Sequence, residues 1–145
     1  MEVTKGNFQT ELPCMLEAIN NADFICYDCE FSGLGKGGIS ITAYETPELI
    51  YTKFKNSLSN YIIVQFGLCT FRYIPDKNRY EYQAFSCFVF PRVPENLKSL
   101  RRIKSVEFGC QADSLNFLAS QNFDFNKWIR DGVSFMRPCD VEKLK

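Results

Sequence analysis

Two segments of the chain alternate hydrophobic and polar residues in the manner of β-strands. They span residues 61–73 and 79–92, and both are rich in aromatic and β-branched side chains, which favour strands. Between them, residues 75–78 have the sequence Pro-Asp-Lys-Asn, a composition typical of a tight turn. The pattern predicts an antiparallel hairpin, which we place beside a third, buried strand at residues 24–31.

A short helix is predicted before that third strand, over residues 10–23. Thr10 is its expected N-cap, Pro13 falls in its first turn, and Asn20-Asn21 marks its end. The residues at helical spacing that should face the core are Leu12, Met15 or Leu16, and Ile19.

Two further segments have helical patterns. Residues 46–60 begin with Thr46 as N-cap and a proline after it. Residues 113–133 are predicted to form one or two helices, capped by Asp113 or Ser114. The expected inward residues are Leu49, Ile50, Phe54 and Leu58 in the first segment, and Leu115, Leu118 and Phe123 in the second.

The strand at residues 24–31 carries two carboxylates, Asp28 and Glu30. Residues two apart on a strand point to the same face, and adjacent carboxylates repel and are costly to desolvate. A divalent cation would offset that cost, because Mg²⁺ and Mn²⁺ prefer oxygen ligands. The alternative is an edge strand that leaves both carboxylates in water.

The cysteines and the lack of histidine limit the possible chemistry. The chain has seven cysteines and no histidine, which excludes a Ser-His or Cys-His nucleophile within it. Cys26 and Cys29 have C-x-x-C spacing, but on a strand their side chains face opposite ways. A zinc site would need two more ligands, so a cysteine-based metal or redox protein is the weakest hypothesis.

The charge balance gives no overall field for holding a polyanion. Lys and Arg number 17, as do Asp and Glu, so nucleic-acid binding would have to depend on a local patch or a metal. The basic stretch Lys98–Lys104 is one candidate patch, although it could equally be a solvated helix face. No hydrophobic run approaches membrane-spanning length, so no membrane partner is expected.

The segment ADFICYDCEFSGL, residues 22–34, resembles the first exonuclease motif of the poly(A)-specific ribonuclease family, which belongs to the DEDD 3′-to-5′ exonucleases. Four further segments also resemble the family and occur in the same order as in its members. They are MEVTKGNF, which precedes this motif, and QFGLCTFRY, FVFPR and CQADSLNFLASQNFDFNKWIRDGVSFM, which come after it. The resemblance implies a ribonuclease-H-like α/β fold, with a mixed sheet and antiparallel hairpin flanked by helices. It also implies that residues 1–145 are the N-terminal part of a single, incomplete exoribonuclease domain.

The same resemblance implies roles for particular residues. Asp28 and Glu30 match the first two acidic, catalytic ligands of a two-metal site that uses Mg²⁺, with Mn²⁺ as a substitute. Four apolar residues match positions that pack around the 3′-terminal adenosine: Phe31, Leu34, Leu115 and Phe117.

The implied function is 3′-to-5′ exoribonuclease activity that shortens poly(A) or other RNA 3′ ends in the cytoplasm and nucleus. Within the family, trimming of piwi-interacting RNA precursors is the alternative. A different class of function is a non-catalytic truncated module that binds RNA, a second copy of itself or a full-length partner.

The chain also departs from the family pattern. The family uses two more aspartates and a histidine general base, which lie further along its chain. Asp113, Asp124, Asp131 and Asp140 lie in segments that match non-catalytic parts of the family, so none of them is assigned to the site. We therefore expect the chain alone to be inactive. The implied sheet leaves the strand at residues 24–31 without a neighbour on one side, so we also expect marginal stability, self-association or dependence on a partner segment.

Overall fold

The computed structural model describes residues 1–35, 39–93, 105–136 and 141–142. The chain divides into two compact units. Unit 1 comprises Met1–Glu30, Val64–Val106 and Asp124–Lys145, and unit 2 comprises Phe31–Ile63 and Glu107–Phe123.

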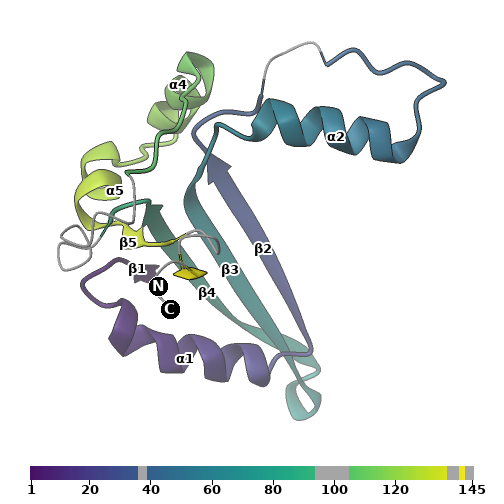
Figure 1. Cartoon of the computed structure of the whole chain (residues 1–145). Coiled ribbons are helices and arrows are strands. Elements are labelled where there is room, and N and C mark those ends of the chain that lie inside the picture. The colour runs from purple at the N-terminus through teal and green to yellow at the C-terminus, as the bar shows by residue number, and fades with distance from the viewer. Residues whose placement is uncertain (36–38, 94–104, 137–140, 143–145) are drawn as a thin grey trace. The chain divides into compact units, whose positions relative to one another are not determined.

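The predicted hairpin is confirmed and forms the centre of the sheet (Figure 1). The strands are β1 (Glu2–Val3), β2 (Phe24–Phe31), β3 (Ile63–Ile74), β4 (Arg79–Phe90) and β5 (Val133–Ser134). Among the described residues the order is β1-β4-β3-β2, with β5 also paired to β4. β3 and β4 are antiparallel, whereas β1 and β5 each run parallel to β4, so the sheet is mixed as predicted.

The turn of the hairpin uses the residues predicted for it. A 3-10 turn, Pro75–Lys77, is followed by Asn78 with φ of 46°, in the left-handed region that asparagine tolerates better than most residues. Tyr73 Oη donates a hydrogen bond to Asn78 Oδ1 at 2.6 Å. The backbone and side chain of Asn78 together fix the register of the two strands.

The prediction of a buried strand at residues 24–31 is wrong for this chain. β2 lies at the edge of the sheet, and Phe24, Ile25 and Tyr27 are 46%, 46% and 74% exposed. In the described part of the chain, β3 alone pairs with it, so the apolar side chains have neighbours on one side only. The exposed edge that the family resemblance implied is therefore present.

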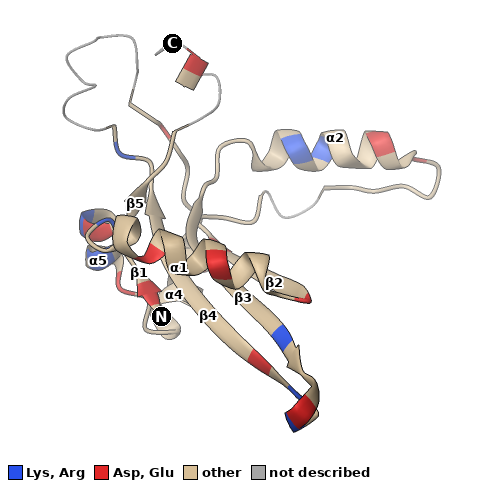
Figure 2. Cartoon of the chain, turned by 90° about the horizontal axis from the view of Figure 1, so that it is seen from below, with Lys and Arg blue, Asp and Glu red and all other residues tan. Residues whose placement is uncertain are grey.

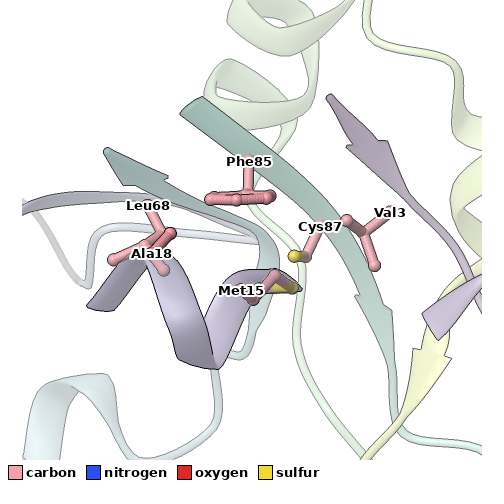
Figure 3. Close-up of a cluster of buried hydrophobic side chains, with 6 residues drawn as sticks. All are labelled: Val3, Met15, Ala18, Leu68, Phe85 and Cys87. Atoms are coloured by element: carbon pink, nitrogen blue, oxygen red, sulfur yellow. The ribbon is translucent and has the colours of Figure 1, made fainter. Parts of the chain in front are cut away.

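Helix α1 (Phe8–Asn20) covers one face of the sheet in unit 1 (Figures 1 and 3). It begins before the predicted Thr10 cap, with Asn7 as N-cap, because Phe8 packs against the core and its N–H donates to Thr4 O at 2.9 Å. Pro13 consequently lies inside the helix rather than in its first turn. Asn21 ends the helix, as predicted.

The core of unit 1 lies between α1 and this face of the sheet, which we call the α1 face. Of the predicted inward residues of α1, Met15 is buried, whereas Leu16 and Ile19 are 50% and 36% exposed. The buried cluster is Val3, Met15, Ala18, Leu68, Phe85 and Cys87 (Figure 3).

Helix α5 (Phe125–Asp131) anchors a second part of unit 1 to β4. Asp124 caps it by accepting a hydrogen bond from Lys127 N. Trp128 is 4% exposed, and its Nε1 donates to Val89 O at 2.8 Å. This buried tryptophan therefore has a structural role.

Unit 2 contains helices α2 (Pro47–Leu58) and α4 (Ala112–Ser120). Thr46 caps α2 as predicted, accepting from Leu49 N, but none of the inward residues expected for α2 is buried. The C-terminal helical segment forms two helices, one in each unit, and α4 begins after Gln111 rather than at Asp113 or Ser114. Leu118 is its buried residue, as expected.

Acidic and basic residues both occur along several of the helices and strands (Figure 2). At the tip of the β3–β4 hairpin, Glu81 pairs with Lys77 at 2.7 Å and Arg79 at 3.6 Å. The basic stretch Lys98–Lys104 lies outside the described residues. No helix among the described residues is long and apolar enough to span a membrane.

Candidate active site

The two carboxylates of β2 lie on the sheet face opposite α1, which we call the carboxylate face. Asp28 and Glu30 line a hollow of about 130 Å³ together with Gln65, Gly67 and Ser86. Gly67 lies directly across from Asp28: a Cβ at Gly67 would come within 4.0 Å of the Asp28 Cβ. The absence of a side chain at Gly67 leaves open space beside Asp28.

Local hydrogen bonds restrain the side chains that line this hollow. Asp28 Oδ1 accepts from the Cys29 backbone N–H at 2.9 Å, which restrains the orientation of this carboxylate. On the sheet floor, Gln65 Nε2 donates to Ser86 Oγ at 2.7 Å. The floor is thus polar and fixed, while the two acidic side chains lie at its rim.

The pKa of the neighbouring Cys29 thiol reflects the negative charge of the two carboxylates. Partial burial raises the pKa of the Cys29 thiol, and the charges of Asp28 and Glu30 raise it further. The thiol therefore stays protonated and a poor nucleophile at neutral pH. Cys26 and Cys29 also point to opposite faces of β2, so neither the geometry nor the raised pKa of Cys29 favours a redox pair between them.

Asp28 and Glu30 are suited to be two of the ligands of a hard divalent cation. Carboxylate oxygens are the preferred ligands of Mg²⁺ and Mn²⁺, and both side chains project from one face of one strand. Among the described residues, no group of three or more His, Cys, Asp or Glu side chains is placed to hold a metal ion. The described part of the chain therefore provides two carboxylates and an open side for further ligands.

The apolar residues predicted to contact substrate belong to unit 2, which begins at Phe31, directly after Glu30 in the chain. Phe31 and Leu34 are 38% and 72% exposed. Ser32, which lies between them, is fully buried. Its Oγ donates to Gly109 O at 2.8 Å and accepts from Ile62 N at 3.0 Å.

Gln111 joins this segment to helix α4. Its Oε1 accepts from Leu34 N at 2.6 Å, its Nε2 donates to Gly35 O, and its backbone N–H donates to Ser32 O at 2.9 Å. Since Gln111 is also the residue from which α4 starts, it brings the 32–35 segment next to the helix that carries Leu115 and Phe117. Phe117 is 56% exposed and Leu115 is half-buried.

Sequence reasoning missed Ser32 and Gln111, which position the predicted residues of unit 2. Their only signal in the sequence is polar character next to apolar positions. The residues that they bond are more than 25 positions away along the chain, as in the Ser32–Ile62 and Gln111–Leu34 pairs. The pattern of residue types along the chain does not indicate hydrogen-bond partners that are so far apart in sequence.

Comparison with known proteins gives consistent results. The profile described as CAF1 family ribonuclease matches residues 3–145. The chain is 40% identical over 148 residues to the poly(A)-specific ribonuclease PARN of Xenopus laevis, covering all of this chain and 23% of that protein. It is 31% identical over 145 residues to the pre-piRNA 3′-exonuclease trimmer of Bombyx mori, covering 99% of this chain and 26% of that protein. The chain thus spans about a quarter of the length of these relatives.

The fold is also that of a known nuclease domain. The structure of Schizosaccharomyces pombe Pop2p in its Mg²⁺- and Mn²⁺-bound form superposes with a TM-score of 0.64 at 17% sequence identity, covering 99% of this chain and 50% of that one. The RNase domain of yeast Pop2 superposes with a TM-score of 0.57. These matches confirm the predicted ribonuclease-H-like α/β fold, and the family resemblance inferred from the motifs is confirmed with them. The chain belongs to the CAF1 ribonuclease family.

Proposed function

We propose that this chain provides the first two metal-binding carboxylates of a 3′-to-5′ exoribonuclease that shortens RNA tails. The observation that carries the proposal is the placement of Asp28 and Glu30 beside the space left by Gly67. This placement occurs in a chain whose sequence matches the CAF1 ribonuclease profile over nearly its whole length.

Asp28 and Glu30 would hold the divalent cations, Mg²⁺ or Mn²⁺. When bound, such a pair of cations stabilises the attacking and leaving oxygens of a phosphodiester displacement. Asp28 is oriented for this role by the Cys29 N–H, and Glu30 reaches the same hollow from the next position on that face. Further ligands and a general base would come from residues beyond these two carboxylates.

The proposed substrate is an RNA whose 3′-terminal nucleotide is adenosine. Phe31, Leu34 and Phe117 expose apolar surface, and base stacking on such side chains contributes about 1–3 kcal/mol per base. Leu115 would complete this apolar set on α4. The higher identity to the poly(A)-specific ribonuclease, 40% against 31% for the pre-piRNA trimmer, favours poly(A) over small-RNA precursors.

The proposal can be tested in a chimera. The N-terminal part of the Xenopus laevis enzyme that aligns with this chain would be replaced by residues 1–145. Oligo(A) RNA labelled at its 5′ end would then be incubated with the chimera in Mg²⁺. We expect a ladder of shortened, labelled products, which is the signature of removal from the 3′ end.

Charge-neutralising variants make the assay specific. Asp28→Asn and Glu30→Gln should each lower the rate at least about 100-fold, because a lost metal ligand removes several kcal/mol of transition-state stabilisation. The matched control is Glu17→Gln, which removes an exposed carboxylate from α1. Full activity in the Asp28→Asn chimera would contradict the proposal, as would an inactive but folded wild-type chimera.

A further inference from the structure

We propose that Cys26 and Cys69 form a cross-strand dithiol on the carboxylate face, and that small-molecule disulfides convert it reversibly into a disulfide bridge between β2 and β3. This site differs from the Cys26-x-x-Cys29 motif in the sequence. It is formed by neighbouring strands, and one of its residues lies two positions before Asp28.

The position of the pair follows from contacts on both sides of it. The rings of Phe24 and Phe71 stack with centroids 4.8 Å apart, and Asp28 lies across from Gly67. From the first pair to the second, β2 advances four residues while β3 goes back four, so these strands are antiparallel. Midway between the two pairs lie Cys26 and Cys69, which therefore face each other directly and point to the same face.

Small reagents have access to both thiols. Cys26 is exposed and Cys69 is half-buried, and both line a hollow of about 230 Å³ on unit 1. Gly67 and Ala84 also line it, so no bulky side chain from these positions covers the sulfurs. By contrast, Cys29 is three residues from Cys26 on the strand, and its side chain is directed to the opposite face.

The spacing of paired strands makes the bridge possible but strained. Directly opposed residues of antiparallel strands have Cβ atoms about 4.5–5.5 Å apart, whereas a disulfide requires about 3.5–4.5 Å. Closing the bridge therefore draws the two strands together by about 1 Å. A strained, accessible disulfide is readily reduced, so this bridge should open and close rather than serve as permanent cross-linking.

The reaction with oxidised glutathione balances as two thiol–disulfide exchanges. One cysteine, as its thiolate, attacks a glutathione sulfur and releases the first glutathione as a thiolate, forming a mixed disulfide. The second cysteine attacks the protein sulfur of that mixed disulfide and releases the second glutathione. The two protons lost by the cysteines are taken up by the two glutathione thiolates, so two protein thiols are oxidised and one glutathione disulfide is reduced.

The bridge would act on the strand that carries both carboxylates. β2 is an edge strand held by β3, and the bridge would tie the two together two residues from Asp28. We expect amide hydrogen exchange in residues 24–30 to slow on oxidation, because the edge strand can then no longer separate locally from β3.

Peptide mapping can test the connectivity without ambiguity. The folded chain would be incubated with oxidised glutathione, treated with iodoacetamide, and digested with trypsin and an Asp-specific protease. Cleavage at Asp23, Asp28 and the basic residues places Cys26 alone in peptide 23–27 and Cys69 alone in peptide 56–72. We expect these two peptides to be joined, and to separate after incubation with millimolar reduced glutathione.

Serine variants provide the controls. The Cys29→Ser and Cys14→Ser variants should form the same cross-link as the wild type, whereas Cys26→Ser and Cys69→Ser should lose it. Circular dichroism would establish that each variant is folded. The proposal is wrong if the folded wild type gives no joined 23–27 and 56–72 peptides, or if Cys26 joins Cys29 or Cys14 to a comparable extent.

Discussion

At the scale of single residues, a few buried polar groups hold unit 2 together. Ser32 is fully buried, and its backbone and hydroxyl bond Ile62, Gly109 and Gln111. These contacts hold the start of the predicted substrate-binding segment against the start of α4. Ser32 is therefore a positioning residue for its neighbours Phe31 and Leu34.

Replacing Ser32 by alanine should lower the free energy of unfolding of unit 2 by about 1–3 kcal/mol, because the partly buried Gly109 O and Ile62 N–H would lose their hydrogen bonds to the Ser32 hydroxyl. Urea denaturation monitored by circular dichroism would measure the loss. The control is Ser59→Ala, since the exposed Ser59 hydroxyl donates only to Asn56 O at the end of α2. Equal effects from the two substitutions would show that the Ser32 network adds no stability.

A second residue-scale prediction concerns pH. Glu45 accepts hydrogen bonds from Lys53 Nζ and from the backbone and hydroxyl of Thr42, and these contacts lower the pKa of its carboxyl group. Because the folded pKa lies below the unfolded one, the stabilisation is present at neutral pH and is lost as the pH falls through the folded pKa.

Hydrogen exchange of the Thr42 amide should therefore become faster, after correction for the intrinsic rate, as the pH falls below about 4.5, the unperturbed range for glutamate. Glu45→Gln should remove most of that pH dependence. A Thr42 amide whose protection is the same at pH 7 and pH 3 would contradict the role assigned to Glu45.

At the scale of elements, periodicity and turn chemistry predicted the hairpin, the end of α1 and the start of α2. These features are local, because they depend on residues within a few positions of each other. The start of α1 and the start of α4 were wrong for a common reason. Phe8 and Gln111 make tertiary contacts that outweigh the local preference for Thr10 and for Asp113 or Ser114 as caps.

The hairpin turn allows a matched pair of substitutions. Asn78 has φ of 46°, so Asn78→Ala should cost about 1–2 kcal/mol through left-handed strain and the lost bond from Tyr73. Asn78→Gly loses the same bond without the strain, and should therefore be less destabilising. Thermal unfolding would rank the two variants, and a more stable alanine variant would contradict the strained turn.

At the scale of the whole molecule, the sequence indicated the family and the two carboxylates, but it did not indicate how exposed β2 is. An apolar strand has the same pattern whether it is central or at an edge, because periodicity records faces and not neighbours. For the same reason, the sequence separated Cys26 from Cys29 by face but could not indicate that Cys69 of the neighbouring strand lies opposite Cys26.

The exposed edge leads to a prediction about association. An unpaired edge with apolar side chains favours pairing with other chains, so the isolated chain should self-associate as its concentration rises. Tyr27→Lys should weaken this, since it places a positive charge on both copies of the edge. Sedimentation velocity would compare it with Tyr44→Lys, a change at a residue of unit 2 that is 97% exposed; equal effects would rule out a role for the β2 edge.

The central claim, that Asp28 and Glu30 together bind a divalent cation, is most directly tested on the isolated chain by Mn²⁺ titration followed by NMR. A bound Mn²⁺ ion broadens the signals of nearby amides. We expect selective broadening at residues 28–30, Gln65 and Gly67, which line one hollow, and its loss in the Asp28→Asn, Glu30→Gln double variant. Broadening centred elsewhere, or unchanged in the double variant, would contradict the claim that these two carboxylates form part of a metal site.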